Sequence, residues 1–453
     1  MHTRLADDLE RLPDLLESTR GYAARLLAGL DARPVARPPD TRPADPLPVE
    51  GIGLEGALTR FAERWEPGLS GSAGPRYLGF VTGGATPASV AGDWLTSTLD
   101  QNVASDGDSS APDLERETLD WLRKLFGLTR THTGAFVSGA TMSNVVGLAI
   151  GREWLGEQYG ISVAQAGTQA LPAIRVLSGS PHSSIYKALS ILGIGREQLH
   201  QLPVLPGREA VDVSALAAAL SQGPAIVVAN AGTVNTADFD NLRAIAALKR
   251  DHRFWLHVDG AFGLFAALSP DHAHLVDGLA EADSVCVDLH KWLNVPYDAA
   301  VQFTRRQDLQ LSVFHNDAAY LGAPAEEPEF VHLTPENSRR MRALPAWFSL
   351  TAYGLAGHRE IVERNIASAR RLGARLATLP GVRLLAPVRL NVVCFTVDGD
   401  ASAVFRSVAE TGEAFLTPTV YAGRPGLRIA FSNWRTGERD EERVFDVLRK
   451  VLA

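Results

Sequence analysis

Residues 284–292 read Ser-Val-Cys-Val-Asp-Leu-His-Lys-Trp, a short apolar run followed at once by polar residues. Such a run is typical of a strand that is buried on both faces of a sheet. Lysine is rarely buried without a partner, so Lys291 is in an unusual place just past this strand and beside Trp292. Its amine is positioned to act as a nucleophile toward a carbonyl carbon.

The other lysines of the chain are poorer candidates for this role. Only five of the 44 basic residues are lysines. Apart from Lys291, all of them fall in predicted helices, where a solvated surface position is expected: Lys124, Lys187, Lys249 and Lys450. Lys291 is therefore favoured by elimination as well as by its context.

Outward from residue 284, short apolar runs alternate with helical stretches. This alternation predicts an α/β fold with an open, mainly parallel sheet. The predicted strands are Ala135–Val137, Ile174–Leu177, Ala225–Ala229, Trp255–Val258, Ser284–Val287 and Ala300–Phe303. The predicted helices between them include Met142–Trp154, Ser183–Leu192, Val213–Leu220 and Leu242–Asp251.

The two ends of the chain follow different patterns. Residues 1 to about 30 predict an amphipathic helix or a helix pair, followed by a proline-rich linker. Beyond a polar stretch at 315–338, a long helix over 342–372 and a strand–helix–strand unit indicate a smaller domain. The predicted divisions are an N-terminal helical arm and linker (1–85), a large domain (86–335) and a small C-terminal α/β domain (336–453).

Several predicted strands end in residues suited to a binding site. In open α/β sheets, ligands bind beyond the carboxyl ends of the strands. Ser138-Gly139-Ala140-Thr141 opens a helix and could hold a phosphate, although it is also an ordinary helix cap. Asp259, His182 and Thr233 each follow a strand, and each alone could be a capping or surface residue. Their convergence on one edge favours a common site.

The sequence from about Pro75 onward resembles the group II pyridoxal-dependent decarboxylases, which include aromatic amino-acid, glutamate and histidine decarboxylases. His290-Lys291-Trp292 together with the upstream Val258-Asp259 is the most specific part of the likeness. The other shared motifs are Tyr77-Leu78-Gly79-Phe80, Gln101-Asn102, Ser138-Gly139-Ala140-Thr141, Pro181-His182-Ser183-Ser184 with Lys187-Ala188, His257, Ala282-Asp283-Ser284, Ser338-Arg339-Arg340 and Asn433-Trp434-Arg435-Thr436.

The resemblance implies a fold type I enzyme that uses pyridoxal 5'-phosphate (PLP), with its active site at a homodimer interface. Lys291 is then expected to hold PLP as a Schiff base, and Asp259 to keep the pyridine nitrogen protonated. His182 and Ala261 are expected on the two faces of the ring and Thr233 near it. The residues expected around the phosphate are Gly139, Ala140, Thr141 and His290.

The implied reaction is decarboxylation of an L-amino acid, with a mild preference for an aromatic one, to an amine and carbon dioxide. One departure concerns the acid that reprotonates the α-carbon. Phe330 stands where the aromatic amino-acid branch has a tyrosine, two residues before His332. If the alignment holds, aldehyde formation with oxygen becomes the alternative. If the loop is shifted, Tyr320 or His332 supplies the proton. Aminotransfer also stays open.

Composition excludes several other classes. The net charge is −8 with no basic stripe, so no nucleic-acid partner is expected. No apolar run is long enough for a membrane span, the N-terminus has no secretory pattern, and no metal site is predicted. The two cysteines are expected to be buried reduced thiols of a cytoplasmic protein. No Gly-x-Gly-x-x-Gly motif follows the first predicted strand, which argues against a nucleotide-binding dehydrogenase. A catalytically inactive binding protein would not need Lys291, Asp259 and His182.

Overall fold

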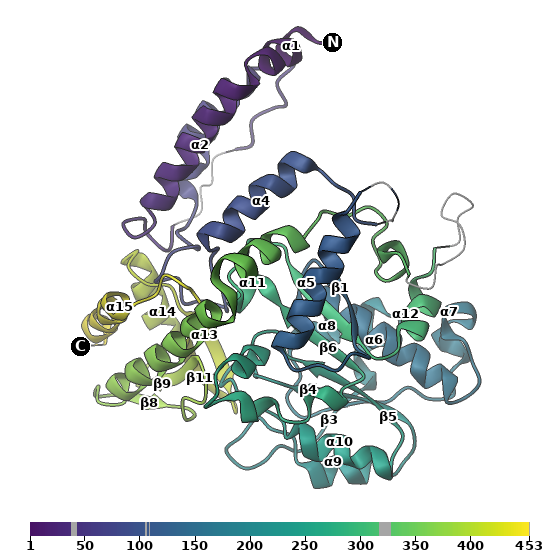
Figure 1. Cartoon of the computed structure of the whole chain (residues 1–453). Helices are drawn as coiled ribbons and strands as arrows, with labels where there is room; N and C mark the ends of the chain where they lie inside the picture. Colours follow the sequence, from purple (N-terminus) through teal and green to yellow (C-terminus); the bar gives the residue numbers. More distant parts are fainter. Residues whose placement is uncertain (38–42, 105–106, 108, 317–327, 453) are drawn as a thin grey trace.

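The computed structural model describes residues 1–37, 43–104, 107, 109–316 and 328–452 of the chain. Its centre is a seven-stranded sheet with strand order β1-β7-β6-β5-β4-β2-β3 (Figure 1). The strands are β1 (Thr133–Val137), β2 (Val176–Ser178), β3 (Leu199–Gln201), β4 (Ala225–Asn230), β5 (Phe254–Asp259), β6 (Ser284–Asp288) and β7 (Ala300–Thr304).

The pairing confirms the predicted, mainly parallel sheet. Five adjacent strands, in the order β3-β2-β4-β5-β6, run parallel to one another. Strand β7 runs antiparallel to both of its neighbours, β6 and β1. The sequence did not predict β3, because its three residues Leu-His-Gln lack an apolar run. Every residue of β4, β5 and β6 is buried, which explains why these strands are apolar throughout instead of alternating.

Helices cover both faces of the sheet. Along β5 the side chains alternate: Trp255 packs on the face covered by α6 (Ala140–Glu157) and α8 (Ser183–Ile191), whereas Leu256 packs on the other. That other face is covered by α5 (Ala111–Leu125), α9 (Val213–Leu220), α10 (Leu242–Ala247) and part of α13 (Ala343–Leu376). The other helices of the large domain are α7 (Val163–Ala166), α11 (Leu289–Trp292) and α12 (Gln307–Phe314).

The C-terminal part forms a second sheet, and the predicted strand–helix–strand unit is only part of it. Four antiparallel strands lie in the order β10-β11-β9-β8, with α14 (Ala401–Glu410) and α15 (Glu438–Val451). The strands are β8 (Val382–Leu384), β9 (Val392–Val397), β10 (Thr417–Tyr421) and β11 (Arg424–Ala430). Strand β8 is short and β10 is half-exposed, so neither has a strong apolar signal. Helix α13 was predicted, but it kinks at Gly354, whose φ of 57° suits glycine.

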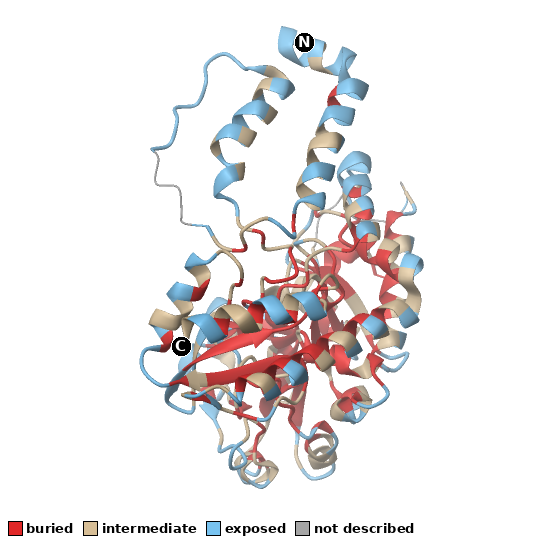
Figure 2. Ribbon diagram, turned by 90° about the vertical axis from the view of Figure 1, so that its left-hand side faces the viewer, coloured by how far each residue is buried: buried red, intermediate tan, exposed pale blue. Residues whose placement is uncertain are grey.

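The N-terminal segment stands away from the body of the molecule (Figure 1). It contains α1 (Thr3–Glu10) and α2 (Leu12–Ala28), as predicted, and α3 (Gly53–Arg64), which was not; α4 (Pro87–Leu99) follows. Figure 2 shows that most of this arm is exposed. The apolar side chains of Leu5, Leu9 and Leu16 are among its exposed residues. Among the described residues, no helix has the length and apolarity that a membrane crossing requires.

Candidate active site

The carboxyl ends of four strands open into one cavity of about 950 Å³. Strand β5 ends at Asp259, β6 ends at Asp288 just before Lys291, and the segments after β1 and β4 add further side chains. All predicted site residues except His332 line this cavity: Gly139, Ala140, Thr141, His182, Thr233, Asp259, Ala261, His290 and Lys291. The parallel sheet therefore brings together residues that lie more than 150 positions apart in the sequence.

Lys291 projects from the short helix α11 into this cavity. Its Nζ lies 3.5 Å from Oδ2 of Asp288, which is almost completely buried, and 5.8 Å from the ring centre of Phe262. No role was predicted for Asp288 from the sequence. The signal was its position three residues before Lys291, which places both side chains on one side of a helical turn. Asp288 thus holds the amine at the cavity wall.

Asp288 also connects two other parts of the site. His290 Nδ1 accepts a hydrogen bond from the backbone N–H of Ala299, so its proton is on Nε2, which lies 3.0 Å from Asp288 Oδ1. The backbone N–H of Ala140, at the start of α6, donates to Asp288 Oδ2 at 3.4 Å. One carboxylate therefore fixes Lys291, His290 and the N-terminus of α6 relative to each other.

Asp259 lies at the end of β5 and is 7% exposed. Its Oδ2 accepts a hydrogen bond from Asn144 Nδ2 at 3.1 Å, and its Oδ1 accepts one from the backbone N–H of Ala261 at 3.2 Å. These two donors hold both carboxylate oxygens in place. The remaining lone pairs of Asp259 are available to a proton-bearing group inside the cavity.

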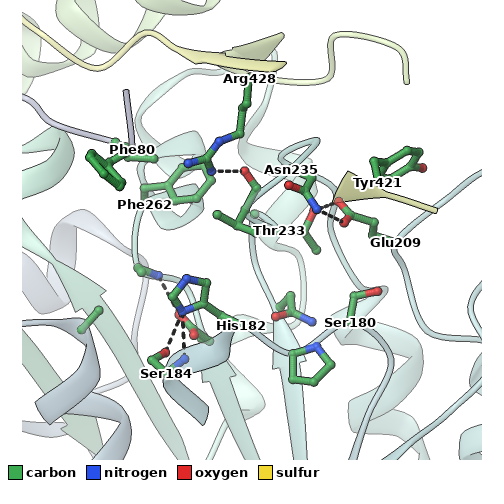
Figure 3. A pocket seen from close by; sticks show the side chains of 18 of the residues that line it. Phe80, Ser180, His182, Ser184, Glu209, Thr233, Asn235, Phe262, Tyr421 and Arg428 are labelled. Carbon is green, nitrogen blue, oxygen red and sulfur yellow. Dashed lines mark hydrogen bonds between the residues drawn. The ribbon is translucent and has the colours of Figure 1, made fainter. Parts of the chain in front are cut away.

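His182 caps α8 and faces the cavity (Figure 3). Its Nδ1 accepts a hydrogen bond from the backbone N–H of Ser184 at 3.2 Å and lies 2.8 Å from the Ser184 hydroxyl. The ring can be reached through the mouth of the cavity but is surrounded by protein, and this burial lowers the pKa of His182. The imidazole is therefore neutral at neutral pH, with Nε2–H as a donor toward the cavity.

The N-terminus of α6 forms another wall, made by Gly139, Ala140 and Thr141. The first turn of a helix presents backbone N–H groups and the positive end of the helix dipole, which together attract anions. Since α6 is 18 residues long and packs across the sheet, this end is held rigidly. An anionic group such as a phosphate is the expected ligand of this wall.

The wall opposite His182 contains polar residues that sequence analysis missed. Arg428, on β11, donates from Nη1 to the carbonyl of Val234, and burial lowers the pKa of Arg428 to about 10 (Figure 3). Glu209 Oε2 accepts hydrogen bonds from the hydroxyls of Thr233, at 2.5 Å, and Thr236, at 2.6 Å. The Thr233 hydroxyl is thus bonded to Glu209. Neither Arg428 nor Glu209 follows a predicted parallel strand, so no sequence signal pointed to them.

A second cavity of about 360 Å³ adjoins the first at Lys291 and His290. Its walls combine aromatic rings with hydroxyl groups, and the rings of His290 and Tyr297 lie 4.3 Å apart. The other lining residues are Ser70, Ser72, Tyr77, Phe80, Val81 and Thr82. The amine of Lys291 therefore lies between the large cavity and a smaller one that is lined by aromatic rings.

His332 and Phe330 do not line the large cavity. His332 is 1% exposed, its Nδ1 accepts a hydrogen bond from the backbone N–H of Asn316, and its ring packs against His315. Phe330 is buried beneath the guanidinium group of Arg339. Packing thus keeps both side chains inside their own subunit in this conformation. Tyr320 lies outside the described residues.

The chain is similar to known proteins over most of its length. Residues 57–398 match the family described as "Pyridoxal-dependent decarboxylase conserved domain". The aromatic-L-amino-acid decarboxylase of Bacillus atrophaeus is 27% identical over 401 residues, covering 84% of this chain and 81% of that protein. The phenylacetaldehyde synthase of Petunia hybrida is 24% identical, covering 93% and 86%. The crystal structure of Oryza sativa TDC with PLP and tryptamine matches with a TM-score of 0.89 at 21% identity over 98% of both chains, which confirms the predicted fold class.

Proposed function

Because the chain belongs to the pyridoxal-dependent decarboxylase family, we propose that it converts an aromatic L-amino acid to the corresponding amine and carbon dioxide. The enzyme is a PLP-dependent amino-acid decarboxylase, like its relatives. The observation that carries the aromatic preference is the smaller cavity beside Lys291, whose walls include the rings of Tyr77, Phe80 and Tyr297. The large cavity holds the groups that suit the cofactor, and the smaller one suits an apolar ring of the substrate.

The donor set of the large cavity fits PLP group by group. Lys291 would hold the aldehyde carbon covalently, and Asp259 would bind the protonated ring nitrogen. The N-terminus of α6 would hold the phosphate, with His290 beside it. His182 and Ala261 would lie against the two faces of the ring. These assignments are supported by the chemistry of an amine, a carboxylate, a helix N-terminus and an imidazole that line one cavity.

When bound, PLP supplies an electron-poor ring that takes up the electron pair left by the departing carboxylate. The protein groups around it then have distinct tasks. Asp259 would bind the ring nitrogen through its carboxylate, and Lys291, whose Nζ lies 3.5 Å from Asp288 Oδ2, would move a proton at the reacting atoms. His182 donates from Nε2 into the cavity. The net change is that the bond from the α-carbon to the carboxylate breaks, carbon dioxide leaves and one proton takes its place.

A substrate screen tests the proposed reaction. We expect purified enzyme supplied with PLP to release carbon dioxide from phenylalanine, tyrosine, tryptophan or their hydroxylated derivatives, and to yield amines by mass spectrometry. Glutamate and 2,4-diaminobutyrate serve as comparison substrates. Faster carbon dioxide release from either of these than from every aromatic amino acid would contradict the aromatic preference.

One observation keeps the aldehyde-forming reaction as a second candidate. If the resemblance aligns the loop as expected, Phe330 takes the place of a tyrosine of the aromatic branch, and one relative is a phenylacetaldehyde synthase. That reaction consumes oxygen and releases ammonia and peroxide in addition to carbon dioxide. Oxygen uptake in the same screen therefore separates the two reactions. Amine with no oxygen uptake supports simple decarboxylation, and aldehyde with peroxide supports the alternative.

We also propose that the enzyme is a homodimer of identical chains. The leucine face of α1 and α2 is exposed, and so are Phe61 and Trp65 at the end of α3 and Trp94 on α4. An apolar arm that stands away from its own subunit is suited to pack on a second copy. Sedimentation equilibrium is expected to give twice the mass of the chain, and replacing Leu5, Leu9 and Leu16 by serine should weaken the association. A fully active monomer would contradict this proposal.

A cytoplasmic location completes the proposal. Cys286 and Cys394 are both free and buried, and burial raises the pKa of Cys394 to about 12. Such thiols are inert and suit a reducing compartment. Recovery of the enzyme in an extracellular or periplasmic fraction would contradict this location.

A further inference from the structure

A chain of hydrogen bonds runs through the core behind Asp259, through side chains that have no role in the mechanism above. Trp255 Nε1 donates to Ser284 Oγ at 2.9 Å, and Ser284 Oγ lies 2.8 Å from His257 Nδ1. His257 Nε2 in turn lies 2.9 Å from Asn144 Oδ1, and Asn144 Nδ2 reaches Asp259. The first four of these side chains are completely inaccessible to solvent. Buried polar groups of this kind form a network in which every bond matters.

The two ends of the chain determine where each proton lies. The Asp259 end fixes the directions: Asn144 gives its NH₂ group to Asp259, so its Oδ1 must accept from His257 Nε2–H. His257 Nδ1 is left to accept from the Ser284 hydroxyl. The Ser284 oxygen in turn accepts from the indole N–H of Trp255, which can only donate. Burial lowers the pKa of His257 to about 4, which agrees with a neutral ring. His257 thus holds the Asn144 oxygen and keeps the NH₂ group turned toward Asp259.

The same amide group serves a second residue of the site. Asn144 Nδ2 donates to Ser184 Oγ at 3.1 Å as well as to Asp259 Oδ2 at 3.1 Å. The Ser184 hydroxyl therefore donates to His182 Nδ1, at 2.8 Å, which leaves the proton of His182 on Nε2. One amide thus connects the carboxylate and the imidazole that lie at different walls of the cavity.

Two glycines of α6 make room for this network. A Cβ atom at Gly147 would lie 2.7 Å from the ring of His257, and one at Gly151 would lie 2.8 Å from Cδ1 of Trp255. These glycines are four residues apart and so lie on the same face of the helix, above the two rings. Any larger residue at 147 would push the His257 ring away from Asn144.

We propose that Asn144 is a positioning residue that orients Asp259 and His182 together toward the bound cofactor, and that His257, Ser284 and Trp255 hold its amide in the required orientation. This inference rests on the proposed function, since it assumes that Asp259 and His182 contact PLP. Without the Asn144 N–H, Asp259 Oδ2 is no longer held in place, and the cofactor ring nitrogen loses a well-oriented negative partner. The lysine-bound nitrogen of the cofactor then keeps its proton to higher pH.

The test replaces Asn144 by leucine, which has a similar shape but no donor, in the PLP-loaded enzyme. The visible absorbance of lysine-bound PLP is titrated with pH, the PLP dissociation constant is measured by equilibrium dialysis, and kcat is determined. We expect the absorbance midpoint to rise by about one to two pH units and kcat to fall about tenfold to hundredfold, the size of one hydrogen bond to a charged group. Gly147→Ala, which removes no polar group, should shift the midpoint in the same direction.

Matched controls separate this role from loss of stability. Asn391 is also fully buried, and its amide donates to the carbonyl of Phe431 in the small sheet. Gly373 is a helical glycine whose Cβ would lie 2.7 Å from Val388. Asn391→Leu and Gly373→Ala should lower the melting temperature with an unchanged absorbance midpoint.

Each result decides between the proposals. If Asn144→Leu and Gly147→Ala both keep the wild-type midpoint, PLP affinity and kcat, Asn144 does not position the site. If Asn144→Leu does not fold, the midpoint of Gly147→Ala alone decides. Wild-type enzyme without any lysine-bound absorbance band would instead contradict the proposed function, and this inference with it.

Discussion

Replacing Lys291 by alanine is expected to abolish covalent binding of PLP and nearly all turnover. The amine of Lys291 projects into the large cavity and lies 3.5 Å from Asp288 Oδ2. No other lysine lines either of the cavities described above. Borohydride reduction of the wild-type enzyme should therefore place a pyridoxyl group on the peptide that contains Lys291. In Lys291→Ala the label should disappear. A positioned acid–base group usually contributes about 10²–10⁴-fold to the rate. The fall in kcat should be larger than this, because the covalent attachment of PLP is lost as well.

Lys187→Ala is the matched control. Lys187 is exposed on α8, outside the cavities, so its loss should leave the label and the turnover unchanged. A pyridoxyl group on Lys187 or Lys249 in the wild-type enzyme would show that Lys291 is not the attachment site.

Replacing Asp259 by asparagine or alanine is expected to slow the reaction by about 10²–10⁴-fold while PLP still binds. The carboxylate is nearly buried and accepts hydrogen bonds from Asn144 and Ala261, so its negative charge would meet a protonated ring nitrogen in a fixed orientation. Neither asparagine nor alanine supplies that charge. The phosphate contacts at α6 and the bond to Lys291 are separate from Asp259, so the absorbance of lysine-bound PLP should persist. Single-turnover kinetics with a good substrate measure the chemical step directly.

Asp240 provides a matched control for this change. It is 2% exposed and accepts hydrogen bonds from the backbone N–H groups of Val211 and Asn230, but it does not line the cavity. Asp240→Asn should lower stability with little change in the chemical step. Near-normal turnover of Asp259→Ala would refute the proposed role of Asp259.

The succession of strands and helices along the large domain was predictable, because strands that are buried on both faces require uninterrupted apolar runs. The runs that end near Asp259 and Asp288 were therefore visible in the sequence, and the residues after them were expected at one edge of the sheet. The same reasoning failed for β3 and for the small sheet, where strands are short or only half-buried. A strand with one exposed face and three to five residues carries too little pattern to be distinguished from a loop.

The amine, the carboxylate and the helix N-terminus of the site could be identified from local sequence patterns, because each follows closely on a strand that its own residues specify. Tertiary packing alone decided which side chains support them. Asn144 reaches Asp259 across 115 positions, and Arg428 reaches Val234 across 194. Packing also placed His332 in the core of its own subunit, away from the cavity. Local patterns report the conformation and burial of neighbouring residues, whereas a hydrogen bond between distant segments depends on how whole elements pack, which no local pattern records.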